Sequence, residues 1–218
     1  GYSLYNQLTA AGVKCVILAP TTMLTPQGVR IKTDMRDAYM IAQCLSYGGY
    51  HAVYIPTEAD DSVKEYLRMR NDHKLALKKI KQQINAFCIR HGFCYDGTKW
   101  TLAHLKWLKK LEITNELYRE TLDEYMASYE EQEAKIERYD KRIKEIAEQT
   151  KYQDKVKKLE CFLGIKTHTA LSLIVETGDF KRFAKGNQYA SYLGLAPGEN
   201  SSSDSIHRLG ITKAGTVI

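Results

Sequence analysis

The chain has 218 residues and a mass of 24.9 kDa, with 44% hydrophobic and 27% charged residues. These values are ordinary for a globular protein with a buried core, and they exclude a wholly disordered chain. No run of about eighteen apolar residues is present, so the sequence predicts no membrane span, and it shows no secretory leader. The five scattered cysteines are typical of reduced thiols, which indicates a cytoplasmic protein without a disulfide framework.

The net charge of +6 is mild, but the charges are unevenly distributed along the chain. Twelve Lys or Arg residues and three acids lie in Lys64–Lys110, whereas Glu112–Glu148 holds six bases and twelve acids. A basic block beside an acidic block indicates two surfaces with different partners. Lys74, Lys78 and Lys81 recur at helical spacing, so they share a face, which fits either phosphate contacts or an ordinary solvated helix face.

The first 56 residues are typical of an α/β unit. The apolar run over 13–19 has the length and composition of a buried strand. Because the unit opens on a helix, we expect its first strand to lie before residue 1 and the chain to be a fragment. The elements expected here are, in order, a helix over 1–11 that Gly12 ends, the strand over 13–19, a helix over about 34–47 that Gly48 and Gly49 end, and a short edge strand over 53–55.

From Thr57 onward the pattern is helical, with a long helix ending near Gly92 and a short helix over 100–111. The next segment carries a heptad seam with steps of four and three and one polar break: Tyr118, Leu122, Tyr125, Tyr129, Gln132, Ile136, Tyr139, Ile143 and Ile146. A seam this regular needs a partner helix. The expected partner is a second copy of the chain in a coiled coil, and the alternative left open is a hairpin within one chain.

Residues 159–176 place a glycine-containing turn between two apolar stretches. This pattern resembles a helix–hairpin–helix, a motif that often offers backbone N–H groups to a DNA phosphate, although this stretch alone favours a plain helical turn. A helix is then expected over 180–195, ending at Gly194. The tail over 197–215 is rich in Ser, Gly and basic residues.

Two segments hold candidate catalytic residues. Asp34 and Asp37 are three residues apart at a helix start, so their carboxylates share a face that is suited to a hard cation such as Mg²⁺. Acids are also favoured in a first helical turn for capping alone.

The second segment is the serine-rich loop that follows Gly198. A serine in such a loop is a candidate nucleophile toward a phosphodiester if nearby groups activate it and stabilise charge. An ordinary polar loop is the alternative. The candidate nucleophiles are Ser201, Ser202 and Ser203, and the candidate supporting groups are His207, Arg208 and Lys213.

Taken together and in this order, three segments resemble one family: KTDMRDA from Lys32, LGIKTHTALSLIVETGDFKRF from Leu163, and YLGLAPGENSSSDSIHRLGITKAG from Tyr192. They resemble the DEDD transposases of the insertion-sequence 110 family, also called bridge-RNA-guided serine recombinases. The resemblance covers almost the whole chain, and it rests on the ordered set rather than on any one motif.

The resemblance implies a mixed α/β, mostly α fold in three parts. Residues 1–56 would be the C-terminal part of a RuvC-like (RNase H-like) domain, and residues 57–155 a helical coiled-coil segment. Residues 156–218 would be a truncated, small helical serine transposase domain with the helix-hairpin-helix-like turn.

The resemblance also implies a site. Asp34 and Asp37 match the last two acids of a Mg²⁺-binding quartet, and Ser202 best matches the serine that attacks DNA. The family usually has glycine where Ser203 stands, which leaves Ser201 and Ser203 in contention.

The implied partners of the full-length protein are double-stranded DNA, a structured guide RNA and further copies in a dimer or tetramer, with no membrane partner. Lys74, Lys78, Lys81, Arg208 and Lys213 would contact nucleic acid, and the fragment alone would be inactive. The alternatives are a non-catalytic nucleic-acid-binding helical protein and a coiled-coil scaffold.

Overall fold

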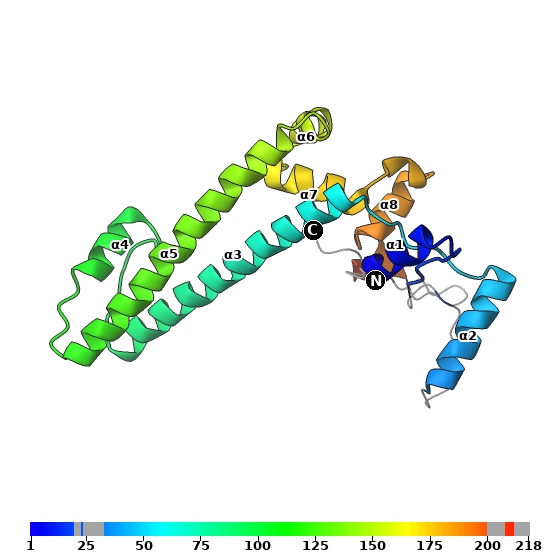
Figure 1. Cartoon of the computed structure of the whole chain (residues 1–218). Coiled ribbons are helices and arrows are strands. Elements are labelled where there is room, and N and C mark those ends of the chain that lie inside the picture. The colour runs from blue at the N-terminus through cyan, green and yellow to red at the C-terminus, as the bar shows by residue number, and fades with distance from the viewer. Residues whose placement is uncertain (20–22, 24–32, 200–207, 212–218) are drawn as a thin grey trace. The chain divides into compact units, whose positions relative to one another are not determined.

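The computed structural model describes residues 1–19, 23, 33–199 and 208–211, and it is mostly helical (Figure 1). The chain divides into two compact units, Gly1–Thr57 and Glu58–Ile218. Within the described ranges, no helix combines the length and the apolar character needed to cross a bilayer.

The first unit contains helices α1 (Tyr2–Ala10) and α2 (Asp34–Tyr47), both of which were predicted from the sequence. Each helix ends where a glycine was expected to end it. Gly12 and Gly48 have φ angles of +77° and +66°, a left-handed conformation that residues with a Cβ rarely adopt. Local sequence therefore determines both helix ends.

The prediction of a buried strand over 13–19 is wrong for the described part of this unit, which does not form that strand. The segment is extended, but its only bridge is an isolated antiparallel one between Leu18 and Ala52, and the edge strand expected over 53–55 is reduced to that contact. The two valines of the run remain 48% and 41% exposed. A strand is buried only when neighbours cover its edges and faces, and the described residues supply one edge contact.

The second unit is built on a long antiparallel helical hairpin of α3 (Glu58–Arg90) and α5 (Glu116–Ala147) (Figure 1). The short helix α4 (Leu102–Lys109) connects them in sequence. After α5, helices α6 (Gln153–Glu160) and α7 (Thr167–Thr177) fold back, and α7 contacts α3, α5 and α6.

The last elements of the unit divide the helix that was predicted over 180–195. A 3₁₀ turn, η2 (Phe180–Arg182), precedes α8 (Gly186–Tyr192), and Gly194 ends this helical region as expected, with a φ of +69°. Two antiparallel strands, β1 (Pro197–Glu199) and β2 (Arg208–Ile211), follow.

The heptad seam of α5 packs against α3 of the same chain, so the hairpin alternative is correct and the preference for self-association through this seam is wrong. One core cluster lies at each end of the hairpin. The physical reason is that α3 presents its own apolar stripe at helical spacing, and association within one chain has no translational entropy cost. The seam residues buried in these clusters are Leu122, Tyr129, Ile143 and Ile146.

Polar contacts occupy the middle of the hairpin, around the predicted break at Gln132. His73 Nδ1 lies 2.8 Å from Gln132 Oε1, and Arg70 donates to both carboxylate oxygens of Asp140 at 2.8 and 3.0 Å. Tyr139 Oη lies 3.5 Å from His73 Nε2. Paired polar groups between two apolar cores disfavour a shifted alignment, so they help to set the register of α3 against α5.

A pH prediction follows from His104, a residue of α4 that is only 2% exposed. Its Nδ1 accepts a hydrogen bond from the Trp100 amide at 3.0 Å, and burial, helped by Lys99, holds its pKa below the ordinary 6.5. Below pH 6.5 the unfolded chain therefore binds a proton that the folded chain resists, and the free energy of unfolding falls until the folded pKa is reached. Urea titrations between pH 5 and 8 measure this dependence.

His104→Asn keeps a comparably placed acceptor and removes the titrating group, so we expect a smaller loss of stability below pH 6.5. His51→Asn, at an exposed histidine of the first unit, is the matched control and should leave the pH dependence unchanged. Equal pH dependence in the His104→Asn variant and the parent chain would contradict the assignment.

Candidate active site and nucleic-acid interface

The predicted acidic pair lies in the first turn of α2. Thr33 precedes the helix and accepts a 3.4 Å hydrogen bond on its Oγ1 from the Arg36 amide, and its carbonyl accepts one from the Asp37 amide at 3.0 Å. The three-residue spacing places Asp34 and Asp37 on one face, with Asp34 exposed and Asp37 half-buried. The helix start predicted for this pair is therefore present, and its role as a metal site stays a prediction.

The donor set of this pair suits magnesium, although it is incomplete. Mg²⁺ prefers oxygen ligands and usually retains waters, so it is often held by one or two carboxylates together with substrate phosphates. The residues for which the structure gives positions contain no group of three or more His, Cys, Asp or Glu side chains arranged for a metal. Asp34 and Asp37 would thus supply two oxygen donors to an ion whose other ligands come from elsewhere.

The predicted serine site lies mostly outside the described residues, namely Ser201, Ser202, Ser203, His207 and Lys213. The two strands that flank it are described, and Glu199 pairs with Arg208 in an antiparallel register. The stretch with the candidate serines therefore connects two paired backbone positions. It belongs to the second unit, whereas Asp34 and Asp37 belong to the first.

A cluster of aromatic rings and one arginine lies just before β1 in the sequence, and sequence reasoning missed this cluster. The Arg182 guanidinium lies 4.5 Å from the ring centre of Phe183 and 4.6 Å from that of Tyr192. Tyr192 Oη donates to the Glu176 carbonyl at 2.8 Å, and Tyr189 Oη lies 3.0 Å from the Thr177 hydroxyl. These contacts fasten α8 to the end of α7, a few residues before β1 begins.

A second feature that sequence reasoning missed is the ion cluster at Glu176. Its carboxylate is 3.4 Å from Lys64 Nζ and 3.3 Å from Arg68, and the side chains of Lys64 and Glu176 are only 7% and 14% exposed. These contacts join α7 to α3. The residues are more than a hundred positions apart, so no local spacing signals the pairing.

Two of the three predicted phosphate-contacting lysines are exposed on α3, and the third is not free for that role. Lys74 and Lys78 are exposed, whereas the Lys81 ammonium lies 5.2 Å from the ring centres of both Trp100 and Tyr129. Lys81 also lies 3.5 Å from Glu133. The shared face is nevertheless present, because all three line one shallow groove of about 480 Å³ with Asn71, Leu75 and Leu77.

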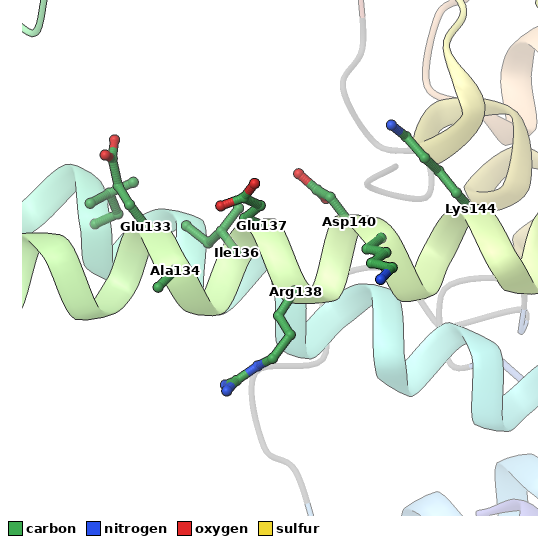
Figure 2. A pocket seen from close by; sticks show the side chains of 9 residues that line it. Glu133, Ala134, Ile136, Glu137, Arg138, Asp140 and Lys144 are labelled. Atoms are coloured by element: carbon green, nitrogen blue, oxygen red, sulfur yellow. The ribbon is translucent and has the colours of Figure 1, made fainter. Parts of the chain in front are cut away.

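A second groove, of about 760 Å³, lies along α5 and has a different electrostatic character (Figure 2). Figure 2 shows Arg138 directed away from an edge of α5 that carries both acidic and basic side chains, namely Glu133, Glu137, Asp140 and Lys144. Glu133 is paired with Lys81 and Asp140 with Arg70. Three acidic and three basic side chains line this groove, whereas lysines are the charged side chains that line the α3 groove, so the exposed lysines of α3 are the better candidate interface for phosphates.

We predict that Lys74→Glu with Lys78→Glu weakens binding of duplex DNA and lowers the slope of log K against log salt by about 2, since each phosphate contact contributes about 0.9. Fluorescence anisotropy at several salt concentrations measures both quantities. The matched control is Lys79→Glu with Lys106→Glu, which makes the same charge change at two exposed lysines outside the groove. If both double variants weaken DNA binding equally, the loss results from the change in net charge, and the α3 groove is not the interface.

Comparison with known proteins shows which proteins this chain resembles. Residues 156–217, from α6 through β2, match the model of a family described as "Transposase IS116/IS110/IS902 family". The chain is similar to transposases of this family. The resemblance inferred from the sequence is confirmed at that level.

Curated relatives extend the similarity across the first unit. A transposase for insertion sequence element IS1533 of Leptospira borgpetersenii is 37% identical over 85% of this chain and 55% of its own length. Putative transposase y4qE of Sinorhizobium fredii is 32% identical over 99% of this chain and 52% of its own. A transposase for insertion sequence element IS1111A of Coxiella burnetii is 26% identical over 91% and 56%. The chain thus spans about half the length of the relatives it matches.

Proposed function

We propose that this chain is part of a mobile-element transposase that cleaves and rejoins double-stranded DNA through a serine nucleophile. The observation that carries the proposal is that a putative transposase matches the chain over 99% of its length, so this similarity includes both candidate catalytic segments. The capped acidic turn of α2 and the strand pair around the serine segment are compatible with it.

In the proposed reaction the Ser202 hydroxyl oxygen attacks a DNA phosphorus. A phosphorus–oxygen bond to serine forms as the bond to one deoxyribose oxygen breaks, and that oxygen leaves as a hydroxyl after accepting a proton. Attack by a DNA hydroxyl on the phosphoserine reverses the steps, so the bond energy is conserved and no nucleotide triphosphate is needed. His207 would move the proton, while Arg208 and Lys213 would stabilise charge on the phosphate oxygens.

Asp34 and Asp37 would hold Mg²⁺ beside the scissile phosphate. The ion supplies Lewis-acid stabilisation of a phosphate oxygen when it is bound. The residues themselves would orient the DNA strand through the bound ion, because both carboxylates lie in the first turn of α2, which the Thr33 side chain caps.

The proposed partners follow from charge and from the family resemblance. Duplex DNA or a structured guide RNA would contact Lys74 and Lys78, because the described residues that line the α3 groove include three lysines and no acid. Further copies of the chain would complete a dimer or tetramer, so that one protomer's acids serve another protomer's serine. Because the seam of α5 is occupied by α3, such assembly would use a different surface.

The test is strand exchange by the full-length protein that contains this chain, on a plasmid carrying the mobile element, with Mg²⁺ and the RNA that co-purifies from cells. We expect joined DNA products that depend on Mg²⁺ and disappear after ribonuclease treatment. Salt-dependent DNA binding without any strand breakage would instead support the alternative function, a non-catalytic nucleic-acid-binding protein. The exposed lysines of α3 favour this alternative.

A further inference from the structure

The turn between α6 and α7 presents two large apolar side chains to solvent. Leu163 is fully exposed, at 105%, the highest value among the large hydrophobic residues whose side chains the structure describes, and the adjacent Phe162 is 64% exposed. Gly164 follows with a φ of +89° and open space where a Cβ would stand, which permits the sharp reversal of the chain. This exposure is an unfavourable arrangement unless a partner covers the two side chains.

Hydrogen bonds and core packing fix the conformation of this turn, so the two side chains are exposed in a defined structure. The Phe162 amide donates to the Leu159 carbonyl and the Ile165 amide to the Phe162 carbonyl, each at 3.1 Å. Leu159 and Ile165, on either side of the tip, pack against the core of α3, α5 and α7. The two apolar side chains therefore project from a supported turn.

Lysines surround this tip. Lys157 and Lys158 lie in the last turn of α6, and Lys166 directly precedes α7; all three are exposed. The acid closest in sequence, Glu160, accepts a 2.6 Å hydrogen bond from the Thr167 hydroxyl. Two exposed apolar side chains are therefore flanked in sequence by three exposed lysines and one acid, a combination that suits duplex DNA.

We propose that Phe162 and Leu163 form an apolar wedge that enters the base stack of duplex DNA while the three lysines contact the flanking phosphates. Apolar side chains that part a base step in this way kink the duplex, and cationic neighbours offset the cost. A protein partner fits less well, because lysine is depleted in protein–protein interfaces. The proposal rests on the proposed DNA function, to which it adds a device that deforms DNA and opens base pairs for strand exchange.

The experiment compares binding of this chain to an intact duplex and to the same duplex with a central mismatch, where a step is already weakly stacked. 2-Aminopurine beside the mismatch reports unstacking by an increase in fluorescence. We expect the parent chain to prefer the mismatched duplex by about tenfold and to raise the fluorescence. Leu163→Ser, alone and with Phe162→Ser, should lose the preference and the signal while keeping the salt dependence of binding.

Leu102→Ser is the matched control, since Leu102 is 79% exposed at the start of α4 and should retain the preference. Thermal unfolding verifies that each variant folds, which is expected because both tip side chains are outside the core. An equal preference in the parent and Leu163→Ser chains would overturn the wedge, as would a change of oligomeric state in the variant without a change in DNA binding. If the parent chain binds DNA without unstacking it, the wedge fails and the DNA function stands; if it binds no duplex at all, both fail.

Discussion

Replacing Ser202 with alanine is expected to abolish the proposed covalent protein–DNA adduct in the full-length protein that contains this chain. The change removes one oxygen, the atom proposed to bond to phosphorus, so strand exchange should fall by about 10³-fold or more. The adduct is measured as DNA retained with protein under denaturing conditions.

The other serines of the same segment provide the controls for this result. Ser205→Ala removes the same oxygen outside the candidate triplet and should leave the adduct intact. An adduct that persists in Ser202→Ala and disappears in Ser201→Ala or Ser203→Ala would move the nucleophile to that residue. An adduct that persists in all three variants would contradict serine catalysis from this loop.

Replacing Asp34 and Asp37 together with asparagine is expected to remove magnesium-dependent strand exchange. Loss of the two carboxylates would weaken the hold on the proposed ion, whose stabilisation of the transition state would be about 4 kcal/mol, equivalent to about 10³-fold in rate. Asparagine keeps the side-chain shape, so the cost in stability is limited to about 1 kcal/mol from the lost interaction with the helix dipole. Rates across a Mg²⁺ titration measure the first effect, and urea unfolding measures the second.

The matched control for the acidic pair is Glu58→Gln, which neutralises an exposed acid in the first turn of α3. It should have a similar small effect on stability and none on exchange. Unchanged exchange in the Asp34, Asp37 double variant would limit the pair to helix capping, the alternative that a first-turn position always allows.

Features that depend on neighbouring residues along the chain were predictable. The ends of α1 and α2 follow from Gly12 and Gly48, because the backbone angles that end a helix are a property of the residue itself. The first turn of α2 depends on a contact that is equally local, because the Thr33 hydroxyl oxygen accepts a hydrogen bond from the Arg36 amide three residues later. The shared face of Lys74 and Lys78 follows from helical spacing alone.

Features that depend on distant residues were predicted incompletely. Lys81 has the spacing of the other two lysines, but Trp100 and Tyr129 approach it from other elements and engage its charge. The contacts of Glu176 and Arg182 join helices and turns in pairings that spacing does not encode. The apolar run over 13–19 predicts a strand, yet burial depends on neighbours that the run does not contain.

The sequence by itself determined most of the helices of this protein, the spacing of its candidate catalytic residues and its family resemblance, because each depends on residue type and on short separations along the chain. Only the tertiary structure decided that the seam of α5 is satisfied by α3, that Lys81 is engaged by aromatic rings, and that Phe162 and Leu163 project into solvent. Hydrophobic burial and ion pairing act between surfaces without regard to separation in sequence. A periodic pattern therefore predicts that a helix needs a partner, and packing selects which partner it has.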